Sequence, residues 1–383
     1  MTSDHPATRR NPTRRLAREV LINGPISRGE LADRLGLSAA SLTRLSKPLL
    51  DSGLLRETED STAGTVGRPT KPLESNPDAH HFIGIKLTAH SAAAVATNLR
   101  CEVLASAEMP LRSLEVEAVV SALTQVAAAV GDLGSFSGIG ISIGGTTSPD
   151  GRVLRAPFLQ WRDVPLARLV QSGTGLPVVL ENDVVALTVA EQWFGAGRDE
   201  PNFAVLTVGA GVGYGLVING NVIAPPDAGL GLIGHYPLDS AAPRCAQCDR
   251  GCASTRLTIA SITAQAQTNM GKDVEYGDIL ELSRRSDPAA TAIVSAAGAG
   301  LGTLLAAIAN LTMVDLIILS GEGVDLADAG AESMERAMHF NRDPEATPIR
   351  LFREPADFTQ WARGAAAVAI QRSILGSLPL TSR

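Results

Sequence analysis

The 383-residue sequence has few aromatic residues, few cysteines and a low share of charged side chains. Aromatic residues make up 4% of the chain, so the core must be built from aliphatic and small side chains, among which 37 glycines allow close packing. Four cysteines in this length exclude a disulfide scaffold. A hydrophobic content of 45% excludes disorder as the main state, and the length predicts two or three domains.

A secretory leader is not expected, because the arginines near the start have no apolar stretch behind them. The uncharged stretch at residues 289–314 is long enough to span a bilayer. It contains glycine and polar residues and lacks flanking anchors, so we interpret it as a buried core helix running into a strand. We therefore expect a cytoplasmic protein without membrane contact.

Charge is distributed unevenly along the chain. Residues 1–72 carry 12 basic and 8 acidic side chains, whereas the remainder carries 21 basic and 32 acidic ones. A basic end on an acidic body indicates that the end, and not the whole protein, meets a polyanion.

The basic end shows three helical patterns. The first covers residues 14–23 and stops at a Gly-Pro pair. Ser27 can cap a second helix, with Glu30 completing a capping box, and Ser38 can cap a third. The second and third are joined by the tight turn 36–38, which is typical of a helix-turn-helix.

The outward face of the third helix carries small, hydroxyl and cationic side chains, which can enter a major groove and read base edges or phosphates. A short strand and a Gly-rich tip at residues 64–71 predict a wing. The expected DNA-binding residues are Ser38, Ser41, Thr43, Arg44, Lys47, Arg68 and Lys71, with phosphate contacts also from Arg14 and Arg15. A three-helix protein-interaction module is the alternative.

The remaining residues alternate between strand-like runs and long Ala/Leu helical stretches, which predicts an α/β fold. The expected strands are 82–87, 92–98, 137–143, 177–180, 203–208, 214–218 and 314–320.

An ordered set of motifs resembles the ROK (repressor, open reading frame, kinase) family of transcriptional regulators. The motifs are Gly24–Ala32 with 36–38, Gly67–Pro69, Trp161–Leu166, Glu181–Asp183, Gly209–Gly215 and Gly234–His235. The resemblance implies a winged helix-turn-helix over residues 1–78. It also implies a ligand-binding and oligomerisation domain over 79–383, an actin-like, ribonuclease-H-like pair of sugar-kinase-type lobes.

Two departures from this resemblance bear on catalysis. The family's first phosphate loop reads roughly Gly-Ile-Asp-Leu-Gly-Gly-Thr, whereas this chain has Lys86 in place of the Asp and lacks both loop glycines. Ala210 replaces a Thr in the second loop. Because phosphoryl transfer needs phosphate loops and a Mg²⁺-directing carboxylate, we expect no kinase activity and no enzyme. An active sugar kinase with a DNA-binding appendage is an alternative.

The resemblance implies that Asn182, Asp183 and His235 bind a ligand, with a sugar or sugar phosphate as effector. However, Leu232 and Ser254 replace two carboxylates of the family's sugar pocket, and Gly144-Gly145 replaces a Pro-Gly. Two alternative interpretations therefore stay open. In the first, the body has lost ligand binding and serves only for dimerisation. In the second, Asn182 and Asp183 have a purely local role in a turn or helix cap.

One histidine and three cysteines have the composition of a closed tetrahedral Zn²⁺ site. They are His235, Cys245, Cys248 and Cys252, the same ligands that the resemblance implies. We expect one structural zinc ion per chain, the alternative being a trio of reduced thiols. Cys101 lies alone in an apolar run and is expected to be buried.

Together these features predict a DNA-binding transcriptional regulator, more specifically a repressor. A homodimer or homotetramer would place two recognition helices on inverted half-sites of double-stranded DNA.

Overall fold

The computed structural model describes residues 11–58, 71–131, 135–271, 273–354, 357–374 and 376. The chain forms two compact units. Unit 1 comprises residues 1–198 and 358–383, and unit 2 comprises residues 199–357. The division at residue 78 that the sequence suggests stays a prediction.

The N-terminal segment of unit 1 forms the three expected helices. They are α2 (Pro12–Asn23), α3 (Arg28–Leu35) and α4 (Ala39–Asp51). The side chains of Asn11, Ser27 and Ser38 cap them by accepting backbone N–H groups. Gly36 ends α3 in the left-handed conformation, φ 64°, and so makes the tight turn into α4.

The wing begins as predicted with β1 (Leu55–Glu57), which pairs antiparallel with β2 (Leu73–Ser75). Leu73 also bridges to Ile26, so the wing is fixed to the segment between α2 and α3. Arg28 on α3 reinforces this through hydrogen bonds to Glu57 and to the carbonyl of Lys71. The expected wing tip, including Arg68, lies outside the described residues.

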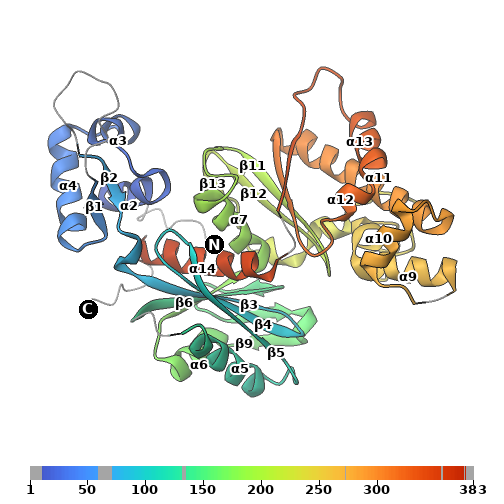
Figure 1. Cartoon of the computed structure of the whole chain (residues 1–383), viewed down its shortest axis with the longest axis horizontal. Coiled ribbons are helices and arrows are strands. Elements are labelled where there is room, and N and C mark those ends of the chain that lie inside the picture. Colours follow the sequence, from blue (N-terminus) through green and yellow to red (C-terminus); the bar gives the residue numbers. More distant parts are fainter. Residues whose placement is uncertain are drawn as a thin grey trace. The chain divides into compact units, whose positions relative to one another are not determined.

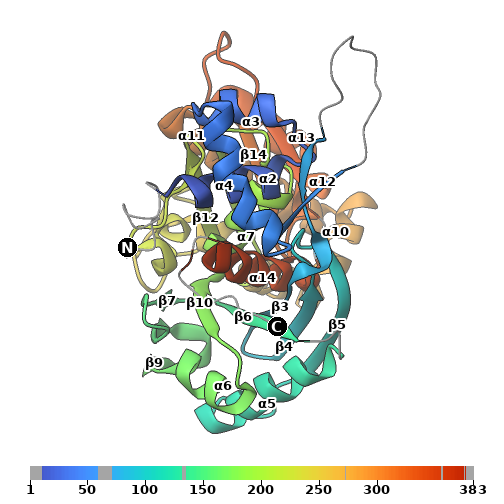
Figure 2. The same ribbon diagram turned by 90° about the vertical axis from the view of Figure 1, so that its left-hand side faces the viewer.

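A five-stranded sheet forms the body of unit 1, with the order β10-β6-β3-β4-β5 (Figure 2). Its strands are β3 (His81–Leu87), β4 (Ser91–Thr97), β5 (Val103–Pro110), β6 (Phe136–Ile143) and β10 (Val178–Asn182). Helices α5 (Val116–Ala129) and α6 (Leu166–Thr174) cover one face, and α14 (Phe358–Ile374) covers the other (Figure 1). Helix α7 (Asp183–Phe194) packs against α14.

Two further parts of unit 1 matter for the candidate site. A small sheet, β7-β8-β9, consists of β7 (Thr146–Thr147), β8 (Val153–Ala156) and β9 (Trp161–Val164). A 3₁₀ turn, η2 (Pro157–Leu159), joins β8 to β9. At the other end of α7, the guanidinium of Arg18 on α2 lies 5.7 Å from the centre of the Trp193 ring, in the range of a cation–π contact.

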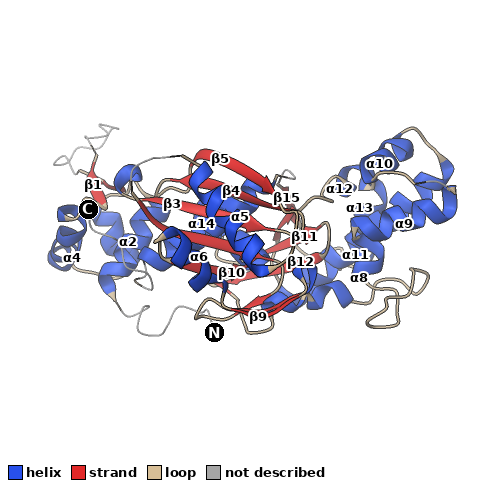
Figure 3. Ribbon diagram, turned by 90° about the horizontal axis from the view of Figure 1, so that it is seen from below, coloured by secondary structure: helices blue, strands red, loops and turns tan. Residues whose placement is uncertain are grey.

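Unit 2 has its own five-stranded sheet, ordered β13-β12-β11-β14-β15. Its strands are β11 (Phe203–Val208), β12 (Val212–Ile218), β13 (Asn221–Val222), β14 (Leu316–Ser320) and β15 (Arg350–Arg353). Figure 3 shows its helices, which are α8 (Ala253–Leu257), α9 (Ile259–Met270), α10 (Tyr276–Arg284), α11 (Pro288–Thr312), α12 (Leu326–Ala329) and α13 (Ala331–Phe340). Each of the seven strands expected from the sequence overlaps an observed strand.

Helix α11 coincides with the uncharged stretch. Within the described residues it is the one helix whose length and composition would allow a membrane crossing, and 67% of its most apolar window is buried in the protein. Its glycines allow neighbouring backbone to approach closely. A Cβ atom added at Gly302 would lie 2.0 Å from the carbonyl oxygen of Met334 on α13. Strand β14 begins four residues after α11 ends, so the expectation of a core helix running into a strand is confirmed.

Helix α14 approaches the sheet of unit 1 just as closely. A Cβ on Gly84 of β3 would lie 2.0 Å from the carbonyl oxygen of Ala362. A Cβ on Gly140 of β6 would lie 1.9 Å from the carbonyl oxygen of Ala365. Only glycine fits at these two strand positions, because backbone and not a movable side chain fills the space.

We predict that Gly84→Ala destabilises the protein by about 1–3 kcal/mol, because the added methyl group must push α14 away from the sheet. Urea titration would measure the free energy of unfolding. Gly277→Ala is the matched control, since no neighbouring atom lies within 4 Å of a Cβ there. Equal stability of the two variants would contradict this account of the packing.

Candidate functional site

The outward face of α4 presents the residues expected to contact DNA. Thr43, Arg44 and Lys47 are exposed, whereas Leu42 and Ser46 on the opposite face are buried. The cationic side chains of Arg44 and Lys47 therefore point away from the core that fixes the helix. Pro48 lies inside α4, and the helix continues beyond it to Asp51.

Three hydroxyl groups on this face also have local structural roles. Ser38 Oγ accepts the N–H of Ser41 at 3.2 Å and donates to Ser41 Oγ at 3.0 Å. Thr43 Oγ1 donates to the carbonyl oxygen of Ala39 at 3.0 Å. These bonds hold the start of α4, and the hydroxyl oxygens keep lone pairs that can accept further hydrogen bonds. Lys71 is exposed and lies two residues before β2.

The two candidate ligand residues of unit 1 lie where β10 ends and α7 begins. Asn182 caps α7, because its Oδ1 accepts the N–H groups of Val184 and Val185 at 3.0 and 3.2 Å. Its Nδ2 donates to the carbonyl oxygen of Gly145 at 3.0 Å. Asn182 thus uses its amide to fix the backbone of the site.

Asp183 forms a buried ion pair that the sequence does not reveal. Lys86 Nζ donates to Asp183 Oδ2 at 2.5 Å, and the two side chains are only 7% and 16% exposed. The same ammonium lies 4.7 Å from the centre of the Trp361 ring on α14. Asp183 Oδ1 accepts the N–H of Val184 at 2.9 Å. Both carboxylate oxygens therefore already have donors.

A second carboxylate, that of Glu181, is buried at the end of β10, two residues before Asp183. Burial raises the pKa of Glu181, although Oε1 accepts the N–H of Asn182 at 2.9 Å. Arg372 on α14 lies 3.8 Å from Oε2. From the sequence, Glu181 was named only as part of a motif. Its position at the end of a predicted strand was the feature that could have identified it as a buried carboxylate.

In unit 2 the loop between β11 and β12 contains Gly209, Ala210 and Gly211. Its turn closes with the N–H of Gly209 donating to the carbonyl oxygen of Gly211 at 3.0 Å. A Cβ on Gly209 would lie 2.0 Å from Oε2 of Glu322, so an acidic side chain lies against this glycine. Nothing in the sequence pattern pointed to Glu322.

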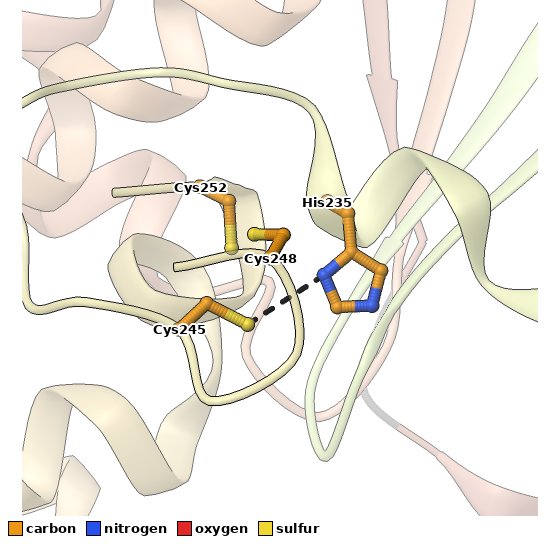
Figure 4. Close-up of side chains that lie close together, drawn as sticks. All are labelled: His235, Cys245, Cys248 and Cys252. Carbon is orange, nitrogen blue, oxygen red and sulfur yellow. Dashed lines mark hydrogen bonds between the residues drawn. The ribbon is translucent and has the colours of Figure 1, made fainter. Parts of the chain in front are cut away.

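The expected metal ligands come together in unit 2. One possible ligand atom from each of His235, Cys245, Cys248 and Cys252 lies within 4.8 Å of the others (Figure 4). His235 Nδ1 and Cys245 Sγ are 3.6 Å apart. Ligand atoms of a tetrahedral zinc site are separated by about 3.3–3.8 Å, given its bond lengths. The residues therefore form a group that could hold a metal ion.

Among the thiols of this group, that of Cys245 differs from the isolated Cys101. Hydrogen bonds from the backbone of Gln247 and Cys248 lower the pKa of Cys245 to about 6, which favours the thiolate that binds metals. Burial raises the pKa of Cys101 to about 12, and this side chain is fully buried as predicted. Cys101 therefore behaves as a small core residue.

The remaining expected ligand residue, His235, belongs to unit 2, whereas Asn182 and Asp183 belong to unit 1. In Figure 4 the imidazole turns Nδ1 toward Cys245 and Nε2 away from the cysteines. Leu232, three residues earlier, is 63% exposed. Ser254 Oγ would lie 2.6 Å from a Cβ on Gly234, so it packs against the backbone beside His235.

Comparison with known proteins agrees with this architecture. The model of the ROK family matches residues 82–372, which is most of the chain, and the chain therefore belongs to the ROK family. The N-acetylglucosamine repressor of Escherichia coli O157:H7 is 27% identical over 315 residues, covering 78% of this chain and 77% of the relative. The xylose repressor of Bacillus subtilis (strain 168) is 25% identical over 312 residues, covering 79% and 80%.

Solved structures separate into regulators and kinases. A ROK family transcriptional regulator, described as a homolog of the E. coli MLC protein, matches with a TM-score of 0.80 and 25% identity, covering 95% of this chain and 96% of its own. The ROK hexokinase of Thermus thermophilus matches with a TM-score of 0.63 and 25% identity, covering 75% of this chain and 97% of its own. The regulator thus accounts for more of this chain than the kinase does.

We predict that Lys86→Met lowers the free energy of unfolding by roughly 3–5 kcal/mol, because it leaves the carboxylate of Asp183 buried without its partner. The double variant Lys86→Met, Asp183→Asn should lose clearly less, since both charges are gone. Urea titration of all three proteins gives the comparison.

Arg285→Ala is the control for loss of an ion pair. Arg285 pairs with Glu281 at 2.9 Å on the surface, with side chains 73% and 47% exposed, so its loss should cost at most about 1 kcal/mol. If the double variant were as unstable as Lys86→Met, the buried charge would not be the cause.

Proposed function

We propose that this protein is a cytoplasmic DNA-binding transcriptional repressor whose kinase-like body has lost phosphoryl transfer and binds a sugar or sugar-derived effector. The winged helix-turn-helix carries the proposal, because α4 exposes Thr43, Arg44 and Lys47 on one face of a capped helix. Its relatives include repressors named for N-acetylglucosamine and for xylose.

The proposed DNA contacts divide into two kinds. Ser41, Thr43 and Arg44 read base edges in the major groove, and Ser38 fixes the start of the helix that presents them. Lys47 and Lys71 contact phosphates and give salt-dependent affinity. Arg68 is proposed to reach the minor groove. Two copies of the chain, as a dimer or within a tetramer, would occupy inverted half-sites.

The charges around both phosphate-loop positions support the loss of phosphoryl transfer. By its resemblance to the family, Asp183 matches the catalytic-base Asp of the kinases. A general base must be free to accept a proton, whereas Asp183 is held by an ammonium at 2.5 Å. A nucleotide phosphate at Gly209 would meet the carboxylate of Glu322, which repels it. A ligand hydroxyl can still bond to the Lys86–Asp183 pair, because an ammonium donates and a carboxylate accepts.

Zinc is the metal proposed for the His/Cys group. Three thiolates and one imidazole suit Zn²⁺, and four protein ligands leave no open position, so the ion would be structural. Its chemistry would be to hold the loop 245–252 against η4 (Leu232–His235) and so to orient the imidazole. Nε2 of His235 would then remain available to a ligand.

We predict that Arg44→Ala weakens binding to a duplex selected from a random-sequence library by about 1–3 kcal/mol and relaxes base preference at one position. Lys47→Ala should weaken all duplexes similarly and reduce the slope of log affinity against log salt by about 1. Fluorescence anisotropy at several salt concentrations measures both quantities.

Arg336→Ala is the control, because Arg336 is an exposed arginine of unit 2 paired with Glu332. This variant should bind DNA like the wild type. Undiminished affinity of Arg44→Ala and Lys47→Ala would contradict the assignment of α4 as the recognition helix.

We predict one zinc ion per chain by elemental analysis, and its loss in Cys248→Ser. A metal present at 1,000 times its dissociation constant stabilises the folded protein by about 4 kcal/mol, so a chelator should lower the unfolding temperature measurably. Cys101→Ser serves as a control for metal content and should retain zinc. Metal-free wild-type protein that unfolds at an unchanged temperature would contradict the zinc proposal.

A further inference from the structure

An exposed aromatic ring lies beside the Lys86–Asp183 pair. Phe158 in η2 is 55% exposed. A Cβ on Gly144 would lie 3.4 Å from Asp183 Oδ2 and 3.4 Å from Cδ2 of Phe158. One methyl group at Gly144 would therefore touch both the carboxylate and the ring. The missing side chain leaves a gap between them.

The turn that carries Phe158 is firmly held. Ala156, Leu159 and Trp161 on either side of the ring are 0%, 2% and 6% exposed and belong to the core of unit 1. Trp161 Nε1 also donates to the carbonyl oxygen of Leu114 at 2.8 Å. These anchors fix the backbone around Phe158 while its ring is exposed.

A single exposed apolar residue needs no explanation on its own. Phe158 differs because the neighbouring groups are polar, fixed and partly open. The Asp183 side chain is 16% exposed, and its orientation is set by Lys86 and the N–H of Val184. An apolar surface next to a few oriented polar groups is the composition of a small-molecule site.

We propose that Phe158 is a specificity-determining residue of the effector site, where its ring packs on the apolar face of a neutral, hydroxylated six-membered ring. A hydroxyl of that ligand bonds to the Lys86–Asp183 pair, and the gap at Gly144 receives the edge of the ring. A neutral ligand is favoured, because the pair already balances one positive charge against one negative charge. This inference rests on the proposed effector function and names the residue that selects the ligand.

The experiment uses the full-length protein and isothermal titration calorimetry with glucose, xylose, N-acetylglucosamine and 4-nitrophenyl glucoside. For the pyranose that binds, Phe158→Ala should raise the dissociation constant roughly tenfold, whereas Phe158→Trp should change it by less than about threefold. Circular dichroism confirms that each variant is folded.

Gly144→Ala tests the gap directly. The backbone of Gly144 lies outside the left-handed region and the methyl group meets its neighbours at ordinary contact distance, so the variant should fold while its binding weakens. Phe340→Ala is the matched control, because Phe340 is 88% exposed at the end of α13 in unit 2. Its affinity should equal that of the wild type.

The outcomes distinguish this inference from the proposed function. Unchanged affinity in Phe158→Ala, together with loss of binding in Asp183→Asn, would overturn the role of Phe158 and leave the effector site standing. Absence of binding by the wild type to all four probes would overturn both the effector and the role of Phe158. DNA binding would be measured separately in either case.

Discussion

Two opposite charges that are largely shielded from water, Lys86 on β3 and Asp183 at the start of α7, constrain the chemistry of unit 1. Their side chains are 7% and 16% exposed, so neither charge tolerates the loss of the other. The pair joins the central sheet to α7, and through the ring of Trp361 it also touches α14. The carboxylate of Asp183 thereby links the central sheet to the start of α7.

Helix α7 connects this framework to the winged helix-turn-helix. Asn182 caps its first turn and Trp193 lies in its last, under the guanidinium of Arg18 from α2. Ten consecutive residues of α7, from Val184 to Trp193, are buried. The candidate ligand residues therefore lie at one end of α7, and its contact with α2 lies at the other end.

The sequence predicted the features that depend on local spacing. The caps Ser27 and Ser38, the tight turn at Gly36 and the grouping of His235 with three cysteines follow from residues close together in the chain. The Lys86–Asp183 pair joins residues 97 positions apart, and no local pattern contains such a contact. The edge strand β5 escaped prediction because it is largely exposed and mixes small, charged and apolar residues.

Strand β15 was missed for a related reason. Its sequence, Arg-Leu-Phe-Arg, lies at the edge of its sheet and carries two charged ends. The sequence pattern also did not identify Phe158 as a candidate ligand contact, because an apolar residue between Ala156 and Leu159 is expected to lie in the core. Only the structure shows that its neighbours are buried while its own ring is 55% exposed.

The contact between α14 and the sheet of unit 1 also affects the order in which the chain can fold during synthesis. Strands β3 and β6 leave the ribosome early, whereas the helix that fills the space above Gly84 and Gly140 follows only after unit 2. At roughly 5–20 residues per second, the more than 200 residues between β6 and α14 take on the order of ten seconds or more to translate. Unit 2 is continuous in sequence and can fold before α14 is made. Until then the face of the unit 1 sheet that α14 covers remains exposed. A chain truncated before residue 358 would lack that cover altogether, so completion of the DNA-binding unit depends on translation through α14.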